Sequence, residues 1–102
     1  MIIADWPAPS NIIAGTTTRA QGNVATHVND DMTVVLRNRA ALREKLSLNN
    51  EPVWLNQQHT VDIVCADDIF DVPPIADASY ASKIDNACIV MTADCLPILI
   101  CN

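Results

Sequence analysis

Two residues of this sequence carry side chains suited to a catalytic or metal-binding site, His59 and Cys95. Cys95 lies within Met91–Pro97, where one apolar run ends and another begins, and His59 comes 36 residues earlier, directly after Gln57-Gln58. An imidazole and a thiolate are both zinc ligands. A cysteine can also act as a nucleophile with a histidine as its base. The residues alone leave both chemistries open.

The metal interpretation is limited by the number of ligands. Catalytic zinc takes three protein ligands and a water molecule, and the sequence has only one other histidine, His27, which is better explained as a loop or capping residue. A zinc site at His59 and Cys95 would therefore need a ligand from outside this chain. Asp94 is a candidate to orient a ligand or take a proton. It could equally accept hydrogen bonds from backbone amides at a strand end.

A third candidate is Arg19, which follows three threonines and precedes the predicted turn Ala20–Asn23. Gly22 allows that turn to use a positive φ angle. A guanidinium group matches the geometry of a phosphate or carboxylate, so Arg19 is a candidate anion-binding residue. The alternative is an ordinary surface arginine.

Composition excludes several classes of partner. The 102 residues carry a net charge of −6, which argues against nucleic acid as a partner. Four of the six basic residues fall on one predicted helix, where a solvated face explains them. No apolar run approaches the ~20 residues of a membrane-spanning helix, and the N-terminal residues do not form a signal peptide. We therefore expect a cytoplasmic protein without a membrane partner.

The four cysteines are expected to be free thiols in a reducing compartment. Three of them, Cys65, Cys88 and Cys101, lie in apolar runs and are predicted to be core residues. The sequence has no CxxC pair, so a structural zinc knuckle is not expected.

One helix and several strands are expected. Apolar residues recur every three or four positions over Thr33–Leu46, with Asp30 or Asp31 as its cap. The expected strands are rich in β-branched and other apolar residues. They cover Asn11–Thr18, Val53–Leu55, Val61–Ala66, Asn86–Met91 and Leu96–Cys101. Ala76–Tyr80 is expected to be a short, tightly packed segment of small residues.

The residue pattern predicts an α/β (α+β) fold with a parallel or mixed β-sheet. Leu96–Cys101 is apolar on both faces, as in a sheet covered on both sides. One helix cannot cover both faces of a five- or six-stranded sheet. We therefore expect residues 1–102 to be the N-terminal part of a single domain of a longer protein.

Three segments resemble the signatures of a known family. They are Trp54-Leu55-Asn56-Gln57-Gln58-His59, Ala76-Asp77-Ala78-Ser79-Tyr80 and Val90-Met91-Thr92-Ala93-Asp94-Cys95-Leu96-Pro97-Ile98-Leu99. Together with Thr17-Thr18-Arg19, they resemble the YfiH-like family, labelled multicopper polyphenol oxidase (laccase domain) and also purine nucleoside phosphorylase. The Thr-Ala-Asp-Cys-Leu-Pro stretch is the most specific. The Ala20-Gln21-Gly22 turn departs from the paired glycines more common in the family.

The resemblance implies an α/β (α+β) sandwich of mixed β-sheets with flanking helices, a zinc site and an enzymatic activity. His59 and Cys95 would be two of three zinc ligands, with a second histidine supplied by a later His-Ala-Gly-Trp-Arg-Gly segment, and Arg19 would contact substrate or phosphate. The implied activity is phosphorolysis of purine nucleosides such as adenosine and inosine, with adenosine deamination at the same site. The candidate assembly is a homodimer. By itself, residues 1–102 would be inactive.

Other functions remain open at this level. Cys95 and His59 could instead serve a metal-free cysteine hydrolase or amidase that edits peptidoglycan, or the domain could be structural with a decayed site. Copper fits less well than zinc, because multicopper chemistry needs many histidine ligands and this chain has two.

Overall fold

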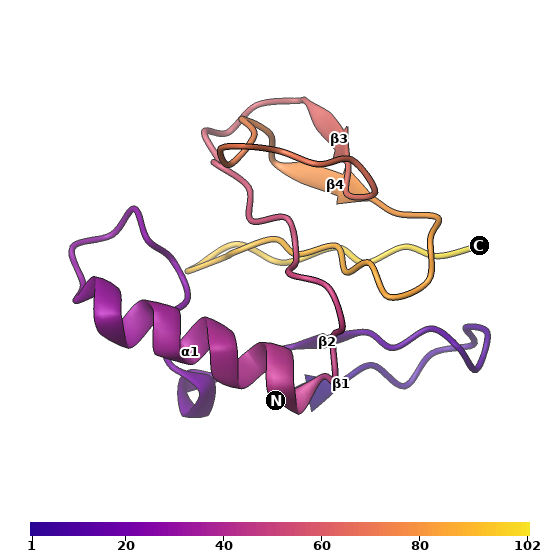
Figure 1. The fold of residues 1–102 in the computed structure, drawn as a ribbon. Coiled ribbons are helices and arrows are strands. Elements are labelled where there is room, and N and C mark those ends of the chain that lie inside the picture. Colours follow the sequence, from indigo (N-terminus) through magenta and orange to yellow (C-terminus); the bar gives the residue numbers. More distant parts are fainter. The chain divides into compact units, whose positions relative to one another are not determined.

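The computed structural model describes all residues, 1–102 (Figure 1). The chain forms two compact units. The first contains Met1–Leu42 and Thr92–Asn102, and the second contains Arg43–Met91. Helix α1 begins in the first unit and ends in the second, and each unit has one two-stranded sheet.

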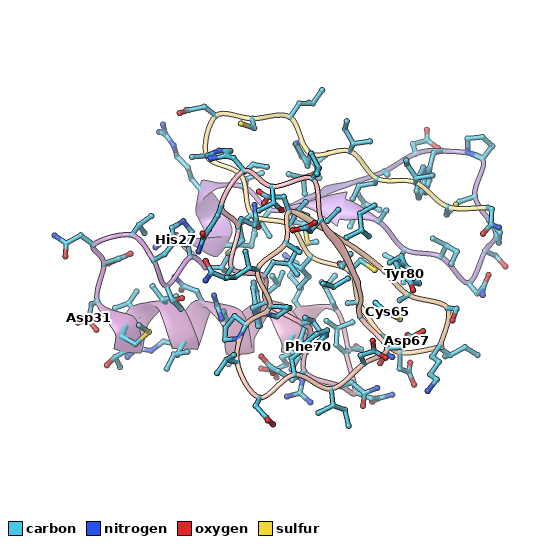
Figure 2. All side chains as sticks on the ribbon, turned by 90° about the horizontal axis from the view of Figure 1, so that it is seen from above. His27, Asp31, Cys65, Asp67, Phe70 and Tyr80 are labelled. Carbon is cyan, nitrogen blue, oxygen red and sulfur yellow. The ribbon has the colours of Figure 1, made fainter.

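Helix α1 spans Met32–Lys45, which confirms the predicted helix to within one residue at each end. Asp31 caps it, because its carboxylate accepts a hydrogen bond from the Thr33 N–H at 2.8 Å and its carbonyl accepts one from the Val35 N–H at 3.1 Å. Figure 2 shows Asp31 at this end of the helix. Val35 and Leu42, both in the predicted apolar pattern, are the buried residues of the helix.

The first unit also contains strands β1 (Ile2–Ile3) and β2 (Gly15–Thr16), which pair in antiparallel fashion, with Ile2 opposite Thr16. Of the predicted strand Asn11–Thr18, only Gly15–Thr16 forms a strand. The short 3₁₀ helix η1 follows at Arg19–Gln21. It replaces the simple turn predicted at Ala20–Asn23.

The second unit is built on strands β3 (Ile63–Cys65) and β4 (Ala78–Tyr80), which run parallel (Figure 1). β3 lies within the predicted strand Val61–Ala66. Single parallel bridges join Val53 to Cys88 and Asn56 to Ile75. The buried apolar residues are Trp54, Leu55, Ala66 and Ala76. Antiparallel and parallel pairs beside a helix confirm the predicted α/β class with mixed strand directions.

Three strand predictions are wrong for this structure. Leu96–Cys101 forms no strand, and Leu96, Ile98 and Ile100 are exposed. Asn86–Met91 and Val53–Leu55 form no strands and contribute only the single bridge between Cys88 and Val53. A strand is stable only where its backbone N–H and C=O groups find a ladder partner, and no segment of this chain pairs with Leu96–Cys101. Apolar composition alone therefore did not suffice to predict a strand.

The predictions for the basic and cysteine residues also need correction. Arg39 is not merely solvated, because its Nε donates to the Val24 carbonyl at 2.8 Å. Arg43 donates to the carbonyls of Leu48 and Asn49 and pairs with Glu51 at 3.0 Å. Helix α1 therefore uses both guanidinium groups to hold flanking loops.

The three cysteines predicted for the core are not fully buried. Cys65 and Cys101 are half-buried and Cys88 is exposed, and all four cysteines of the chain are free thiols. Their apolar neighbours in sequence belong to segments that are short or unpaired here, so those segments do not enclose the thiols.

None of the helices has the length and apolar character that crossing a bilayer would demand.

Candidate functional site

His59 lies in a tight loop of the second unit. Its backbone takes a left-handed conformation, with φ at 58°, a region that few residues other than glycine adopt. The side chain is exposed. The loop is Gln58–Thr60, between the bridge residue Asn56 and strand β3. The loop thus lies between Val53–Leu55 and Val61–Ala66, two of the segments predicted as strands.

Asp77 holds this loop. Its carboxylate accepts hydrogen bonds from the backbone N–H groups of Gln58 (3.2 Å), His59 (3.1 Å) and Thr60 (2.7 Å). It also accepts one from the Thr60 hydroxyl at 3.0 Å. These donors, led by the Thr60 N–H, hold the pKa of Asp77 below its usual range although partial burial opposes the shift. Asp77 is therefore ionised throughout the neutral range.

Gln57 makes a second fixed contact beside His59. Its side-chain Nε2 donates to the Met91 carbonyl, and its Oε1 accepts from the Met91 N–H, both at 2.8 Å. A glutamine amide thus replaces a strand partner for one residue. Met91 directly precedes the segment Thr92–Cys95 in the chain.

Arg19 begins helix η1 in the first unit. Thr18 caps this helix by accepting from the Ala20 N–H at 3.4 Å, and the Gln21 side chain accepts from the Thr18 N–H at 2.8 Å. Gly22 closes the helix with φ at 76° and donates its N–H to the Arg19 carbonyl. The Arg19 side chain is exposed, so its guanidinium group is accessible to an anion.

Cys95 and Asp94 are both exposed and lie outside helices and strands. Cys95 is a free thiol. No hydrogen bond joins Asp94 to a backbone amide, in contrast to Asp77. The first unit thus contains Arg19, Asp94 and Cys95, and the second contains His59.

The chain contains no group of three or more His, Cys, Asp or Glu side chains arranged to hold a metal ion. His27, the other histidine, is exposed in the loop before helix α1 (Figure 2). Sequence reasoning missed the structural roles of Asp77 and Gln57. A usable signal was present for Asp77, an acidic residue between two small apolar residues in Ala76–Ala78.

Comparison with known proteins gives consistent results. Residues 14–102 match a family model described as multi-copper polyphenol oxidoreductase laccase. A purine nucleoside phosphorylase of Pseudomonas aeruginosa is 42% identical over 96% of this chain, and the purine nucleoside phosphorylase YfiH of Escherichia coli is 36% identical over all of it. This chain covers 43% and 46% of those two proteins.

A solved structure supports the same assignment. The crystal structure of a Neisseria meningitidis protein of family DUF152 matches 92% of this chain with a TM-score of 0.77 and 36% identity. The chain covers 42% of that protein, and so spans less than half the length of the relatives it matches. The extent of the family match, over most of the chain, shows that the protein belongs to the family described as multi-copper polyphenol oxidoreductase laccase, the YfiH-like family that its sequence resembles.

Proposed function

We propose that the complete protein is a zinc-dependent purine nucleoside phosphorylase that also deaminates adenosine. The observation that carries the proposal is the likeness to relatives named purine nucleoside phosphorylase, at 36–42% identity over almost the whole chain. The relatives extend well beyond the length covered by this chain. The activity is therefore assigned to the complete protein, with residues 1–102 contributing part of the site.

The residues present fit a zinc ion. His59 and Cys95 are exposed donors of the two types that zinc prefers, and the Cys95 thiol is in no disulfide. Cys95 follows Met91 by four residues, which an extended chain spans in at most about 14 Å. We propose His59 and Cys95 as two ligands and a third from the rest of the protein. Zinc, when bound, acidifies a water molecule and so supplies a nucleophile for C6 of adenine.

For phosphorolysis, we propose that Arg19 binds the phosphate. A phosphate oxygen forms a bond to C1′ of the ribose while the bond from C1′ to the purine breaks, and the purine nitrogen keeps the electron pair and takes a proton. The exposed Arg19 guanidinium can pair with two phosphate oxygens and neutralise their charge. Asp94 is the proposed proton-transfer or ligand-orienting group, because its carboxylate is exposed beside Cys95.

The test measures turnover of inosine and adenosine by the complete protein with and without phosphate. We expect ribose 1-phosphate and free base only with phosphate, inosine from adenosine in either case, and loss of both activities in Cys95→Ala. Cys88→Ala removes another exposed free thiol and is the matched control. Wild-type turnover in Cys95→Ala would contradict the proposal.

A metal-free cysteine hydrolase that edits peptidoglycan is the second candidate, favoured by the exposed thiol of Cys95. Anomalous scattering at the zinc edge from crystals of the complete protein separates the two. A zinc ion bound to both His59 and Cys95 would mean that the Cys95 thiol is not free to act as a nucleophile. An unmetallated thiol that becomes alkylated, with loss of an amidase activity, would favour the hydrolase.

A further inference from the structure

The loop that carries His59 is organised by one distant side chain. Asp77 follows the loop by 17 to 19 residues and accepts hydrogen bonds from the backbone N–H groups of three consecutive residues, Gln58, His59 and Thr60. Both carboxylate oxygens are used, because Oδ2 accepts from His59 and Oδ1 from the two flanking residues. Three amides therefore converge on a single carboxylate.

This convergence accounts for the unusual backbone of His59. Consecutive N–H groups of an extended segment point in opposite directions, so all three can face one acceptor only if the chain turns sharply. The positive φ of His59 supplies that turn. A histidine in this region is uncommon, and strained conformations persist where the surroundings hold them.

Asp77 is itself fixed by the second unit. Its N–H donates to the Asp62 carbonyl at 3.3 Å. The preceding residue, Ala76, is fully buried and donates to the Asn56 carbonyl at 3.2 Å. The next residue begins strand β4, which pairs with β3. The sheet thus fixes the backbone from which the Asp77 carboxylate extends, whereas Gln58 and His59 of the loop are exposed.

We propose that Asp77 is a positioning residue for the site, and that it sets the direction of the His59 imidazole by fixing the backbone from which that side chain leaves. The proposal rests on the proposed function, since it assumes that His59 binds zinc. It goes further by naming a residue that acts on the proposed ligand His59 through the backbone of its loop. If Asp77 only stabilised the loop, removing its carboxylate would not change the zinc affinity.

The experiment is a double-mutant cycle in the complete protein with Asp77→Asn, His59→Asn and the double variant. Asparagine at position 59 tolerates a positive φ but lacks the imidazole. Zinc affinity is measured by competition with a chelator, thermal midpoint by calorimetry, and inosine phosphorolysis as kcat and KM. Asp71→Asn is the control, since it removes one exposed carboxylate that makes no hydrogen bond.

We expect Asp77→Asn to weaken zinc binding by about tenfold or more, the usual effect of disturbing a group that orients a ligand. In the His59→Asn background the same change should leave zinc affinity unaltered, whereas the loss in thermal midpoint should be similar in both backgrounds. Equal losses of zinc affinity in the two backgrounds, or none in either, would overturn the positioning role.

Failure of the proposed function gives a different pattern. If His59→Asn itself retains wild-type zinc affinity and turnover, the zinc assignment fails and the role of Asp77 falls with it. If His59→Asn loses both while Asp77→Asn retains both, only the positioning role is overturned. Should Asp77→Asn not fold, Thr60→Val removes the hydroxyl that donates to Asp77 and accepts from the Asp62 N–H, and leaves the three backbone N–H groups in place. It should weaken zinc binding by about tenfold, the smallest loss usual for a group that orients a ligand, and an unchanged affinity would overturn the proposal.

Discussion

Gln57 and Met91 form a reciprocal pair in which one side-chain amide satisfies both backbone groups of a residue far along the chain. Both hydrogen bonds are 2.8 Å long and partly buried. The pair ties the segment that carries His59 to the residue from which the chain continues towards Cys95. Strand pairing is sparse in this region, with single bridges at Val53 and Asn56, so a side chain supplies what a longer ladder would otherwise provide.

We expect Gln57→Met to destabilise the protein by about 2 kcal/mol, because a thioether of similar shape leaves the Met91 N–H and C=O without partners. Urea unfolding followed by the fluorescence of Trp54 and Trp6 measures the change. Gln58→Met is the control, since the Gln58 side chain donates only one exposed hydrogen bond, to Asn56 at 3.3 Å. Equal losses in the two variants would show that the Met91 pair adds no stability.

The turn beside Arg19 should reject every residue other than glycine. Gly22 has φ at 76° and ψ at −177°, a combination essentially confined to glycine, and an added Cβ would lie 2.6 Å from Nδ2 of Asn38. We expect Gly22→Ala to cost about 1–3 kcal/mol. Gly22→Asn should cost as much, because this is not the left-handed helical region that asparagine tolerates. Calorimetry of both variants tests this, and rescue by asparagine would mean that the turn has a different backbone.

The sequence predicted best the features that are decided locally. Helix α1 was predicted to within a residue because its apolar period and the Asp31 cap lie within one short stretch. Strand predictions did less well, since a strand depends on a partner that its own residues do not specify. Leu96–Cys101 has strand composition, but no ladder partner is present in the chain.

The candidate site divides in the same way. The types of His59, Cys95 and Arg19 were sufficient to single them out, because metal ligation and anion binding depend on a few side-chain groups. The roles of Asp77 and Gln57 arise from contacts across 17 to 34 residues. No local sequence pattern predicts such contacts, so the roles of these two residues could be identified only from the structure.

Asp67 should make stability depend on acid pH. Its carboxylate accepts hydrogen bonds from Asn86, from the Ser82 N–H and hydroxyl, and from the Lys83 N–H. These donors, led by the Asn86 side chain, hold its pKa well below the usual range. Figure 2 shows Asp67 in the same part of the structure as Cys65 and Tyr80, the paired ends of β3 and β4.

A carboxylate with a depressed pKa in the folded state adds stability that is complete above its unfolded pKa and is lost as pH falls towards the folded value. The stability difference between wild type and Asp67→Asn should therefore be constant above pH ~5 and shrink below pH ~4. Thermal midpoints of both proteins between pH 2 and 7 measure it. Asp68→Asn is the matched control, because its carboxylate makes no hydrogen bond. A difference that is independent of pH would contradict the expectation.

Substitutions of Arg19 can separate the effect of its positive charge from the effect of its guanidinium geometry. Its side chain is exposed and makes no hydrogen bond within the chain, so replacing it should leave stability unchanged. Arg19→Lys retains the positive charge but cannot form two parallel hydrogen bonds to one phosphate. If Arg19 binds phosphate through that fork, the KM for phosphate in inosine phosphorolysis should rise about tenfold, equivalent to about 1.4 kcal/mol, and Arg19→Ala should raise it further.

The control for Arg19 is Arg37→Lys, the same change at an exposed arginine on helix α1. The KM for inosine should change less than the KM for phosphate in Arg19→Lys, because the nucleoside has no group that needs a guanidinium fork. Equal phosphate KM values for Arg19→Lys and Arg37→Lys would remove Arg19 from the phosphate site. A rise in Arg19→Ala alone would instead indicate that the positive charge matters and the fork does not, since lysine preserves the first and lacks the second.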